Sequence, residues 1–370
     1  MRITDYQLTI TKQKTTMKDL VKVFAVLLAA LSCPSCDKGF VSAVEEGKPC
    51  VLDVCVGGAL EASVGTKAGS GNADEKISSV QIMVFNTGTG QLDGALYKGN
   101  LEAYGQWNGT DRIYCTTGPR QVYAIVNSPV NYVEGDSKVS DIGDLKSVMV
   151  SLAENGTSRL VMAGASEIRT LTSPEESITV NVDRLCAAVV LKEVTNRMYA
   201  PVYRDRVRIT GAYLMNVPGV CPLVDDASFT AASLESGKWY ARNAEDRSSP
   251  VSGLLSASYS GTSAPLEYDR TTQFGTVFYA FPNEIETAAS DVWSPSSTYL
   301  VVKASIDGKD CVYPVRLGAL EGNKRYEVSL VLHRVGGNPD SPYDEIEFSD
   351  VIPTLVVTDW ADGDPIMQEI

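Results

Sequence analysis

The sequence predicts an all-β protein with two tandem β-sandwich domains that follow a lipoprotein signal peptide. Short apolar segments alternate with polar residues at a period of two, which is the signature of half-buried strands. Clusters of Gly, Asn, Asp, Ser and Pro separate these segments, and no long stretch has a period of 3.6 residues. Many short strands with turns every 8–12 residues or so are typical of β-sandwiches.

Residues 1–35 are predicted to be a secretory signal of the lipoprotein type. An apolar run at residues 21–31 is shorter than the roughly 20 residues that span a bilayer, and Cys33 and Cys36 follow it. Residues 1–16 fit no signal design, so Met17 is the more natural start. Either cysteine could carry the lipid, and Cys36, which begins a polar tether, is slightly favoured. A redox role for this pair would require a βαβ context that the sequence lacks.

The rest of the chain divides into an N-terminal domain at residues 36–172 and a C-terminal domain at 173–370. The expected boundary is the polar stretch at residues 170–177, and one short helix is expected within 140–153. The six cysteines after Cys36 permit disulfides outside the cytoplasm, although buried free thiols are favoured for most of them. Strands are predicted at 51–56, 80–85, 122–126, 178–182, 207–217, 277–281, 299–306, 312–317, 326–332 and 354–360.

Composition and motifs argue against catalysis and against nucleic-acid binding. The formal net charge is −14, whereas a nucleic-acid binder needs a basic face. The single histidine, His333, excludes sites built from two histidines and is expected on a solvated strand face. Phosphate loops and nucleophile elbows are absent from the sequence. The acidic stretch at residues 359–364 is interpreted as a solvated turn rather than a cation site, so no catalytic residue, metal ligand or cofactor is predicted.

Each end of the mature chain carries a strand that could be detached. The strand at residues 51–56 precedes a Gly- and Ser-rich loop whose Lys67 suits a trypsin-like protease. The other strand, at residues 355–360, precedes a polar tail. The alternative is that both strands pair only within their own sheets.

The chain resembles the fimbrillin family of the Bacteroidales, also called type V pilins. The lipoprotein start, the first strand and the loop at Lys67 come in the order of the family, and Lys67 departs from the Arg of its best-known members. The further segments that carry the resemblance are residues 77–85 (ISSVQIMVF), 121–129 (QVYAIVNSP), 160–164 (LVMAG), 182–189 (VDRLCAAV), 278–284 (FYAFPNE), 324–330 (KRYEVSL) and 354–364 (TLVVTDWADGD).

The resemblance implies transthyretin-like sandwiches and assembly by donor-strand exchange. A trypsin-like protease would cut after Lys67, so that the mature chain starts at Ala68 and the first strand leaves an apolar groove. The last strand of another subunit would fill this groove, which satisfies main-chain hydrogen bonds at an open sheet edge. Such a head-to-tail contact does not close on itself and generates a filament. The donor set is expected to be either Leu355 with Val357, or Val356 with Trp360.

These observations favour a structural subunit of a cell-surface fimbrium that serves adhesion. Since the chain has both a cleavage loop and a donor strand, the stalk role is preferred to tip or anchor. Its expected partners are copies of itself, other fimbrial subunits, the processing protease and the outer membrane, which holds the precursor by its lipid before the subunit joins the fimbrium. The alternative is a non-polymerising outer-membrane lipoprotein that binds glycans, and an extracellular hydrolase is least favoured.

Overall fold

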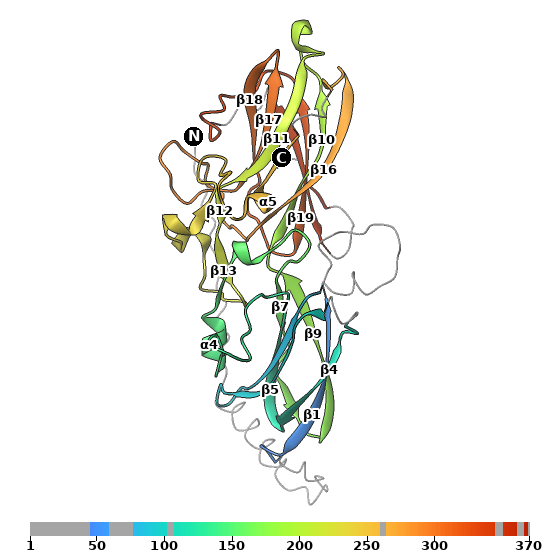
Figure 1. Cartoon of the computed structure of the whole chain (residues 1–370), viewed down its shortest axis with the longest axis vertical. Coiled ribbons are helices and arrows are strands. Elements are labelled where there is room, and N and C mark those ends of the chain that lie inside the picture. Colours follow the sequence, from blue (N-terminus) through green and yellow to red (C-terminus); the bar gives the residue numbers. More distant parts are fainter. Residues whose placement is uncertain are drawn as a thin grey trace, which may run out of the picture. The chain divides into compact units, whose positions relative to one another are not determined.

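The computed structural model describes residues 45–58, 77–101, 107–259, 264–344, 351–360 and 366–368. Strands dominate this part of the chain, which confirms the predicted all-β class with sandwich-like sheets (Figure 1). Its α-helices are α4 (Ile142–Lys146) and α5 (Ser252–Leu255). The helix expected within residues 140–153 is α4, which begins where the Asp141 carboxylate accepts a hydrogen bond from the Asp144 amide.

The first sheet contains the N-terminal strands in the order β3-β2-β5-β7-β9-β1-β4, and β8 pairs with β5 outside this order. The first strand of the chain, β1, is therefore an interior strand of this sheet rather than an edge strand. The strands are β1 (Pro49–Gly58), β2 (Val80–Asn86), β3 (Leu92–Lys98), β4 (Thr110–Thr116), β5 (Gly118–Val126), β7 (Met162–Ala165), β8 (Arg169–Leu171) and β9 (Glu175–Arg184).

This sheet rolls until its two end strands, β3 and β4, approach each other. The Asp93 carboxylate in β3 accepts hydrogen bonds from the backbone amide and the hydroxyl of Thr116 in β4. Gly94 permits the approach, because a Cβ at this position would lie 2.4 Å from the Tyr114 carbonyl oxygen. The rolled sheet encloses an apolar core.

Two neighbouring interior strands, β2 and β5, are buried on both faces. Val80, Ile82 and Val84 face the core inside the rolled sheet, whereas Met83 and Phe85 pack against a second core. The alternation in the sequence is therefore real, but both of its faces are covered by apolar side chains. By contrast, β9 alternates between buried and exposed residues, as expected for a half-buried strand.

The C-terminal strands form two sheets on either side of the second core. One sheet has the order β16-β10-β19-β20-β21, and the other has the order β15-β11-β17-β18. The strands are β10 (Ala187–Asn196), β11 (Val207–Met215), β15 (Ser256–Ser258), β16 (Arg270–Ala280), β17 (Tyr299–Ile306), β18 (Lys309–Arg316), β19 (Lys324–Leu332), β20 (Val351–Asp359) and β21 (Ile366–Gln368). Two small sheets pair β12 (Val217–Pro218) with β14 (Trp239–Tyr240), and β13 (Val220–Pro222) with β6 (Met149–Ser151).

The sheets change later in the chain than the expected boundary at residues 170–177. That polar stretch connects β8 to β9, and both belong to the first sheet. Its polarity reflects a turn in which the Glu176 carboxylate accepts hydrogen bonds from the amides of Thr172 and Ser173. The chain enters the second pair of sheets only after β9, at Leu185 and Cys186. A division after residue 172 would separate β9 from its partners, so the sheet pairing places the change at Leu185.

Candidate functional site

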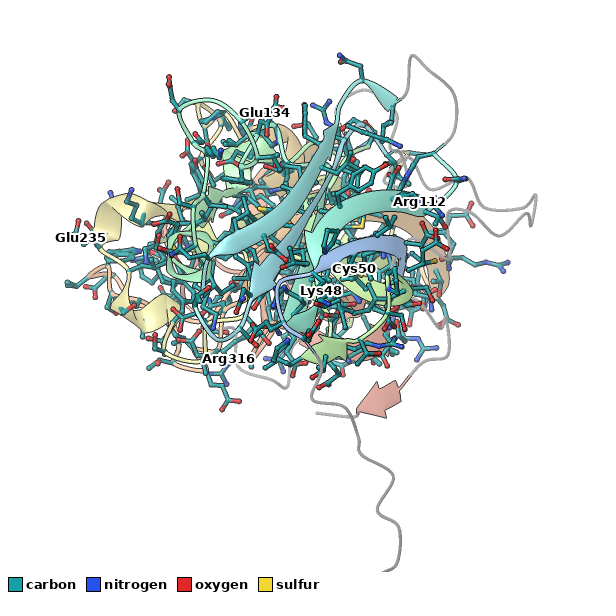
Figure 2. The ribbon with its side chains drawn as sticks, turned by 90° about the horizontal axis from the view of Figure 1, so that it is seen from below. Lys48, Cys50, Arg112, Glu134, Glu235 and Arg316 are labelled. Atoms are coloured by element: carbon teal, nitrogen blue, oxygen red, sulfur yellow. The ribbon has the colours of Figure 1, made fainter. Side chains whose placement is uncertain are left out.

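The first strand, β1, lies between β4 and β9 and supplies one wall of the first core. It pairs antiparallel with β4, where Leu52 lies opposite Ile113, and parallel with β9, where Val54 lies opposite Ile178. Figure 2 shows the strand that carries Cys50 beside the strand that carries Arg112. Every second residue of β1 points inward, and these residues are Cys50, Leu52, Val54 and Val56, at 2%, 0%, 0% and 5% exposure.

The burial of these side chains shows how much free energy β1 contributes to the stability of the folded chain. At about 1.5–3 kcal/mol for each buried Val or Leu, Leu52, Val54 and Val56 contribute roughly 5–9 kcal/mol. Without β1, the facing backbone groups of β4 and β9 would lose their hydrogen-bond partners and the core would open to water. A strand with apolar residues at alternate positions is what fits such a groove.

The outer face of β1 is polar and solvated. The Asp53 carboxylate accepts two hydrogen bonds from the Arg112 guanidinium of β4, with N···O distances of 2.9 and 3.2 Å. These bonds hold the pKa of Asp53 below its usual value. Since both side chains are exposed, the pair fixes the register of the two strands more than it stabilises them.

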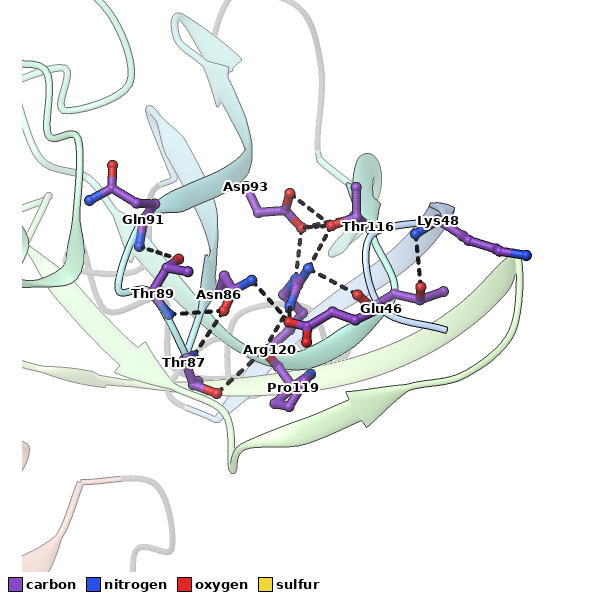
Figure 3. A network of polar contacts seen from close by, with 12 residues as sticks. Glu46, Lys48, Asn86, Thr87, Thr89, Gln91, Asp93, Thr116, Pro119 and Arg120 are labelled. Carbon is purple, nitrogen blue, oxygen red and sulfur yellow. Dashed lines mark hydrogen bonds and ion pairs between the residues drawn. The ribbon is translucent and has the colours of Figure 1, made fainter. Parts of the chain in front are cut away.

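A buried arginine, Arg120, holds the segment that leads into β1 (Figure 3). Its side chain is 2% exposed, and its Nε donates to the Asp93 carboxylate at 2.7 Å. The Arg120 guanidinium also lies 3.6 Å from a Glu46 carboxylate oxygen, so it joins the start of the described chain to β3 and β5. Thr117 adds a second tie, because its hydroxyl donates to the Glu45 carbonyl at 2.6 Å and accepts from the Lys48 amide at 3.0 Å.

The candidate donor strand, β20, is paired within its own chain. It runs antiparallel to β19 along its whole length, from Val351 opposite Leu332 to Asp359 opposite Lys324. On its other side, among the described residues, only its segment from Leu355 to Val357 has a partner, which is β21. In the single chain, both terminal strands therefore pair within their own sheets: β1 pairs with β4 and β9, and β20 pairs with β19.

The candidate donor residues differ in their surroundings. Leu355 is buried at 6% exposure, and Val357 and Trp360 pack against the second core, whereas Val356 is partly buried. The Trp360 ring stacks on Tyr279 with its centroid 6.0 Å away and an angle of 10° between the planes. The Arg184 guanidinium, at the end of β9, lies 4.5 Å from the Trp360 ring centre. Trp360 thus fastens the end of β20.

The expected lipidation sites Cys33 and Cys36 and the expected cleavage site at Lys67 and Ala68 lie outside the described residues. Lys67 lies between two described strands in the sequence: β1 ends at Gly58, and β2 begins at Val80. A cut anywhere between these two strands would separate β1 from all the later strands.

No catalytic constellation emerges from the described ranges. His333 is buried at 8% exposure, stacks on Tyr199 with ring centres 4.6 Å apart, and its Nδ1 lies 3.2 Å from the Arg197 carbonyl oxygen. It is therefore a packed side chain immediately after β19, not the solvated strand residue that was expected. The described residues also contain no group of three His, Cys, Asp or Glu side chains placed to hold a metal ion. Within the same residues, no helix is long and apolar enough to cross a membrane.

Two tryptophans that are far apart in the sequence meet in the fold. The rings of Trp239 and Trp293 lie 5.9 Å apart at an angle of 66°. Trp239 is buried at 6% exposure within a small apolar cluster that includes Ile285. Trp239 is therefore covered, and the partly buried Trp293 packs edge-on against it rather than forming with it a flat platform for a sugar ring.

This arrangement, a rolled sheet closed by the first strand and followed by a sandwich that ends in the last strand, recurs in several solved structures. The chain shares its fold with a candidate cell adhesion protein from Bacteroides eggerthii at a TM-score of 0.61 and 19% identity, covering 86% of this chain and 98% of that one. A candidate cell adhesion protein from Parabacteroides distasonis matches at a TM-score of 0.58 and 14% identity, covering 85% and 99% of the two chains. A fimbrilin from Porphyromonas gingivalis matches at a TM-score of 0.57 and 17% identity, covering 86% and 99%.

Sequence comparison gives a match over part of the chain. Residues 51–197 match the family model of the major fimbrial subunit protein (FimA), which confirms the resemblance to the fimbrillins. No curated protein matches the chain. The matched residues start inside β1 and end just after β10, so they include every strand that lines the groove. These matches support a component of a cell-surface fimbrium.

Sequence reasoning did not find Arg120 or its partner Asp93. Asp93 lies in β3 and Arg120 in β5, both outside the strands predicted from the sequence, and no local pattern distinguishes a buried arginine from a solvated one. The turn residues Gly118 and Pro119 next to Arg120 mark a strand start, but the partners of Arg120 become visible only when the sheet is rolled.

Proposed function

We propose that the protein is a fimbrial subunit, of the stalk type, that polymerises for adhesion by protease-triggered donor-strand exchange. The observation that carries the proposal is the position of β1, which is an interior strand between β9 and β4 yet is joined to all the later strands only through residues 59–79. A single cut in this segment makes β1 a separate piece. Cleavage between Lys67 and Ala68 by a trypsin-like protease meets this requirement.

The groove that β1 leaves requires another apolar strand. The described part of the chain offers β20, which carries Leu355 and Val357 on one face and Val356 on the other. To act as a donor, β20 must first separate from β19 and lose the stacking of Trp360 on Tyr279. The burial of its apolar side chains in the groove of another subunit must offset the free energy of these lost contacts. Insertion of two or three apolar side chains at about 1.5–3 kcal/mol each provides this offset.

Before cleavage, the precursor is held at the outer membrane by a lipid on Cys36 or Cys33. The lipid keeps the subunit near its assembly site, and cleavage in the loop separates the lipid and β1 from the mature subunit together. Lipidation, cleavage and release of the groove are thus coupled by the order of the segments in the sequence. Replacement of both cysteines by alanine should abolish fatty-acid labelling and retention at the outer membrane.

The experiment that tests the proposal is to determine the N-terminus of subunits in surface filaments by peptide mass mapping. The proposal predicts a start at Ala68 and no peptide from β1. A Lys67→Ala variant should keep residues before Ala68 and should not polymerise, while a matched Lys38→Ala variant should be processed normally. Subunits that retain Cys36 in every filament would contradict the proposal. A surface protein that never polymerises and binds glycans would favour the glycan-binding lipoprotein instead.

A further inference from the structure

Two cysteines face each other across the strand pair that holds β1 in place. Cys50 of β1 is the register partner of Cys115 of β4, and both side chains point into the first core at 2% and 6% exposure. Both thiols are free in this structure. No other cysteine in the described part of the chain lies opposite a cysteine in a strand ladder, and Cys55, on the outer face of β1, lies opposite Thr110.

The backbone geometry of this pair suits a disulfide. Directly opposed residues of antiparallel strands have Cα atoms about 4.5–5.5 Å apart and side chains on the same face. Disulfides bridge Cα atoms about 4.4–6.8 Å apart. The bond could therefore form without displacement of either strand. An exported protein also folds in a compartment where disulfides persist.

We propose that Cys50 and Cys115 form a disulfide in the exported precursor, and that this bond keeps β1 attached to β4 after the loop is cut. The bond forms by exchange with an oxidised dithiol protein or a small-molecule disulfide: one thiolate attacks the oxidant, and the second displaces it from the mixed disulfide. The two cysteines lose two protons and two electrons, and the oxidant becomes two thiols. The consequence for strand release rests on the proposed function, whereas the bond itself requires only export to a compartment where disulfides persist.

Burial decides when the bond can form and how long it lasts. Burial raises the pKa of Cys115 to about 12, so the folded protein holds almost no reactive thiolate at this position. Oxidation therefore belongs to the time before the rolled sheet closes. Once β1 is in place, a reductant has no access to sulfur atoms that lie inside the core.

The disulfide would make assembly depend on two events instead of one. Cleavage alone leaves β1 tethered, because β4 remains part of the mature chain on the other side of the cut. The groove opens only after the bond is reduced by exchange with a dithiol protein, which becomes a disulfide as Cys50 and Cys115 return to thiols, and this exchange requires local opening of β1 from β4. A subunit that is cut too early would therefore stay closed, and its apolar groove would stay covered.

The first test measures the bond without reference to cleavage. The full chain is taken from the cell envelope in denaturant with N-ethylmaleimide, and its cysteine peptides are identified by mass. We expect a linked peptide that contains Cys50 and Cys115, with Cys55 alkylated as the internal control. Alkylation of both Cys50 and Cys115 in most molecules would overturn the proposal, whatever the filaments show.

The second test measures the tether. A site for a sequence-specific protease replaces residues 66–68, and the cut chain is run on a denaturing gel with and without dithiothreitol. The segment that contains β1 should stay attached without dithiothreitol and separate with it. A Cys50→Ala/Cys115→Ala variant should release the segment in both lanes, and a Cys55→Ala variant should behave like the parent chain. Release from the parent chain without reductant would overturn the tether. Because the cut is engineered, neither outcome depends on natural processing at Lys67.

Discussion

Replacement of a single inward residue of β1 should destabilise the precursor and leave the assembled filament unaffected. Leu52 is fully buried between β4 and β9, so the change Leu52→Ala removes apolar burial and leaves a cavity. Such changes cost about 2–5 kcal/mol in the free energy of unfolding. With a urea slope of about 3 kcal/mol per molar, a loss of about 3 kcal/mol lowers the unfolding midpoint by about 1 M.

The matched control is Val51→Ala on the outer face of the same strand. Val51 is only partly buried and lies opposite the exposed Tyr114, so its truncation should cost less than about 1 kcal/mol. Urea unfolding of the precursor can be followed by tryptophan fluorescence, because Trp107 packs against this core. Equal effects of the two changes would refute the assigned direction of the β1 side chains.

The same variants distinguish removal of β1 from its retention. If β1 leaves on processing, filaments assembled from Leu52→Ala subunits should dissociate at the same urea concentration as filaments of the parent protein. If the destabilisation measured in the precursor persists in the filament, β1 is still in the sheet. In that case, the reasoning that leads from the interior position of β1 to its removal is wrong.

Three further predictions follow from the described contacts. Arg120→Met leaves the Asp93 carboxylate without its buried partner and should cost about 3–5 kcal/mol in thermal or urea unfolding, whereas Arg112→Met at the exposed pair should cost at most about 1 kcal/mol. Trp360→Ala removes an aromatic pair and a cation–π contact worth about 1–3 kcal/mol together, so β20 amides should exchange faster, and Trp360→Phe should retain part of the protection. The hydrogen bond from the Thr172 backbone amide is the main cause that lowers the pKa of Glu176 below its usual value of 4.5. The contribution of Glu176 to stability is therefore present above pH 4.5 and is lost as the pH falls through the lowered pKa. Glu176→Gln should remove this loss, so that the free energy of unfolding depends less on pH in this acidic range.

Much of the fold could be predicted because local alternation is what the strands require. The pattern of buried and exposed residues in β9 and the short helix α4 near its Asp141 cap both follow from the sequence directly. The covering of both faces of β2 could not be predicted, since it depends on residues far away in the chain that pack on Met83 and Phe85. The place where the chain changes sheets could not be predicted for a related reason, because a polar turn between two strands of one sheet has the same composition as a linker.

The candidate site could also be predicted only in part. The sequence identified β1 and the strand with Leu355 and Trp360 as the two terminal strands, and both are strands in the fold. The position of β1 in the middle of a sheet, and the pairing of Cys50 with Cys115, follow from strand order, which no local pattern encodes. The fastening of Trp360 by Tyr279 and Arg184 likewise requires three segments to meet in space.

The most direct test of donor-strand exchange is a cross-link between two different subunits. In a Cys50→Ala/Cys115→Ala background, one chain carries Ile178→Cys in β9, opposite the place of Val54, and the other carries Val356→Cys or Val357→Cys, one for each face of β20. After processing and mild oxidation, the account predicts a disulfide between the two chains from one of the two donor positions. Unprocessed chains should give none. Filaments in which neither position cross-links between chains would contradict the account.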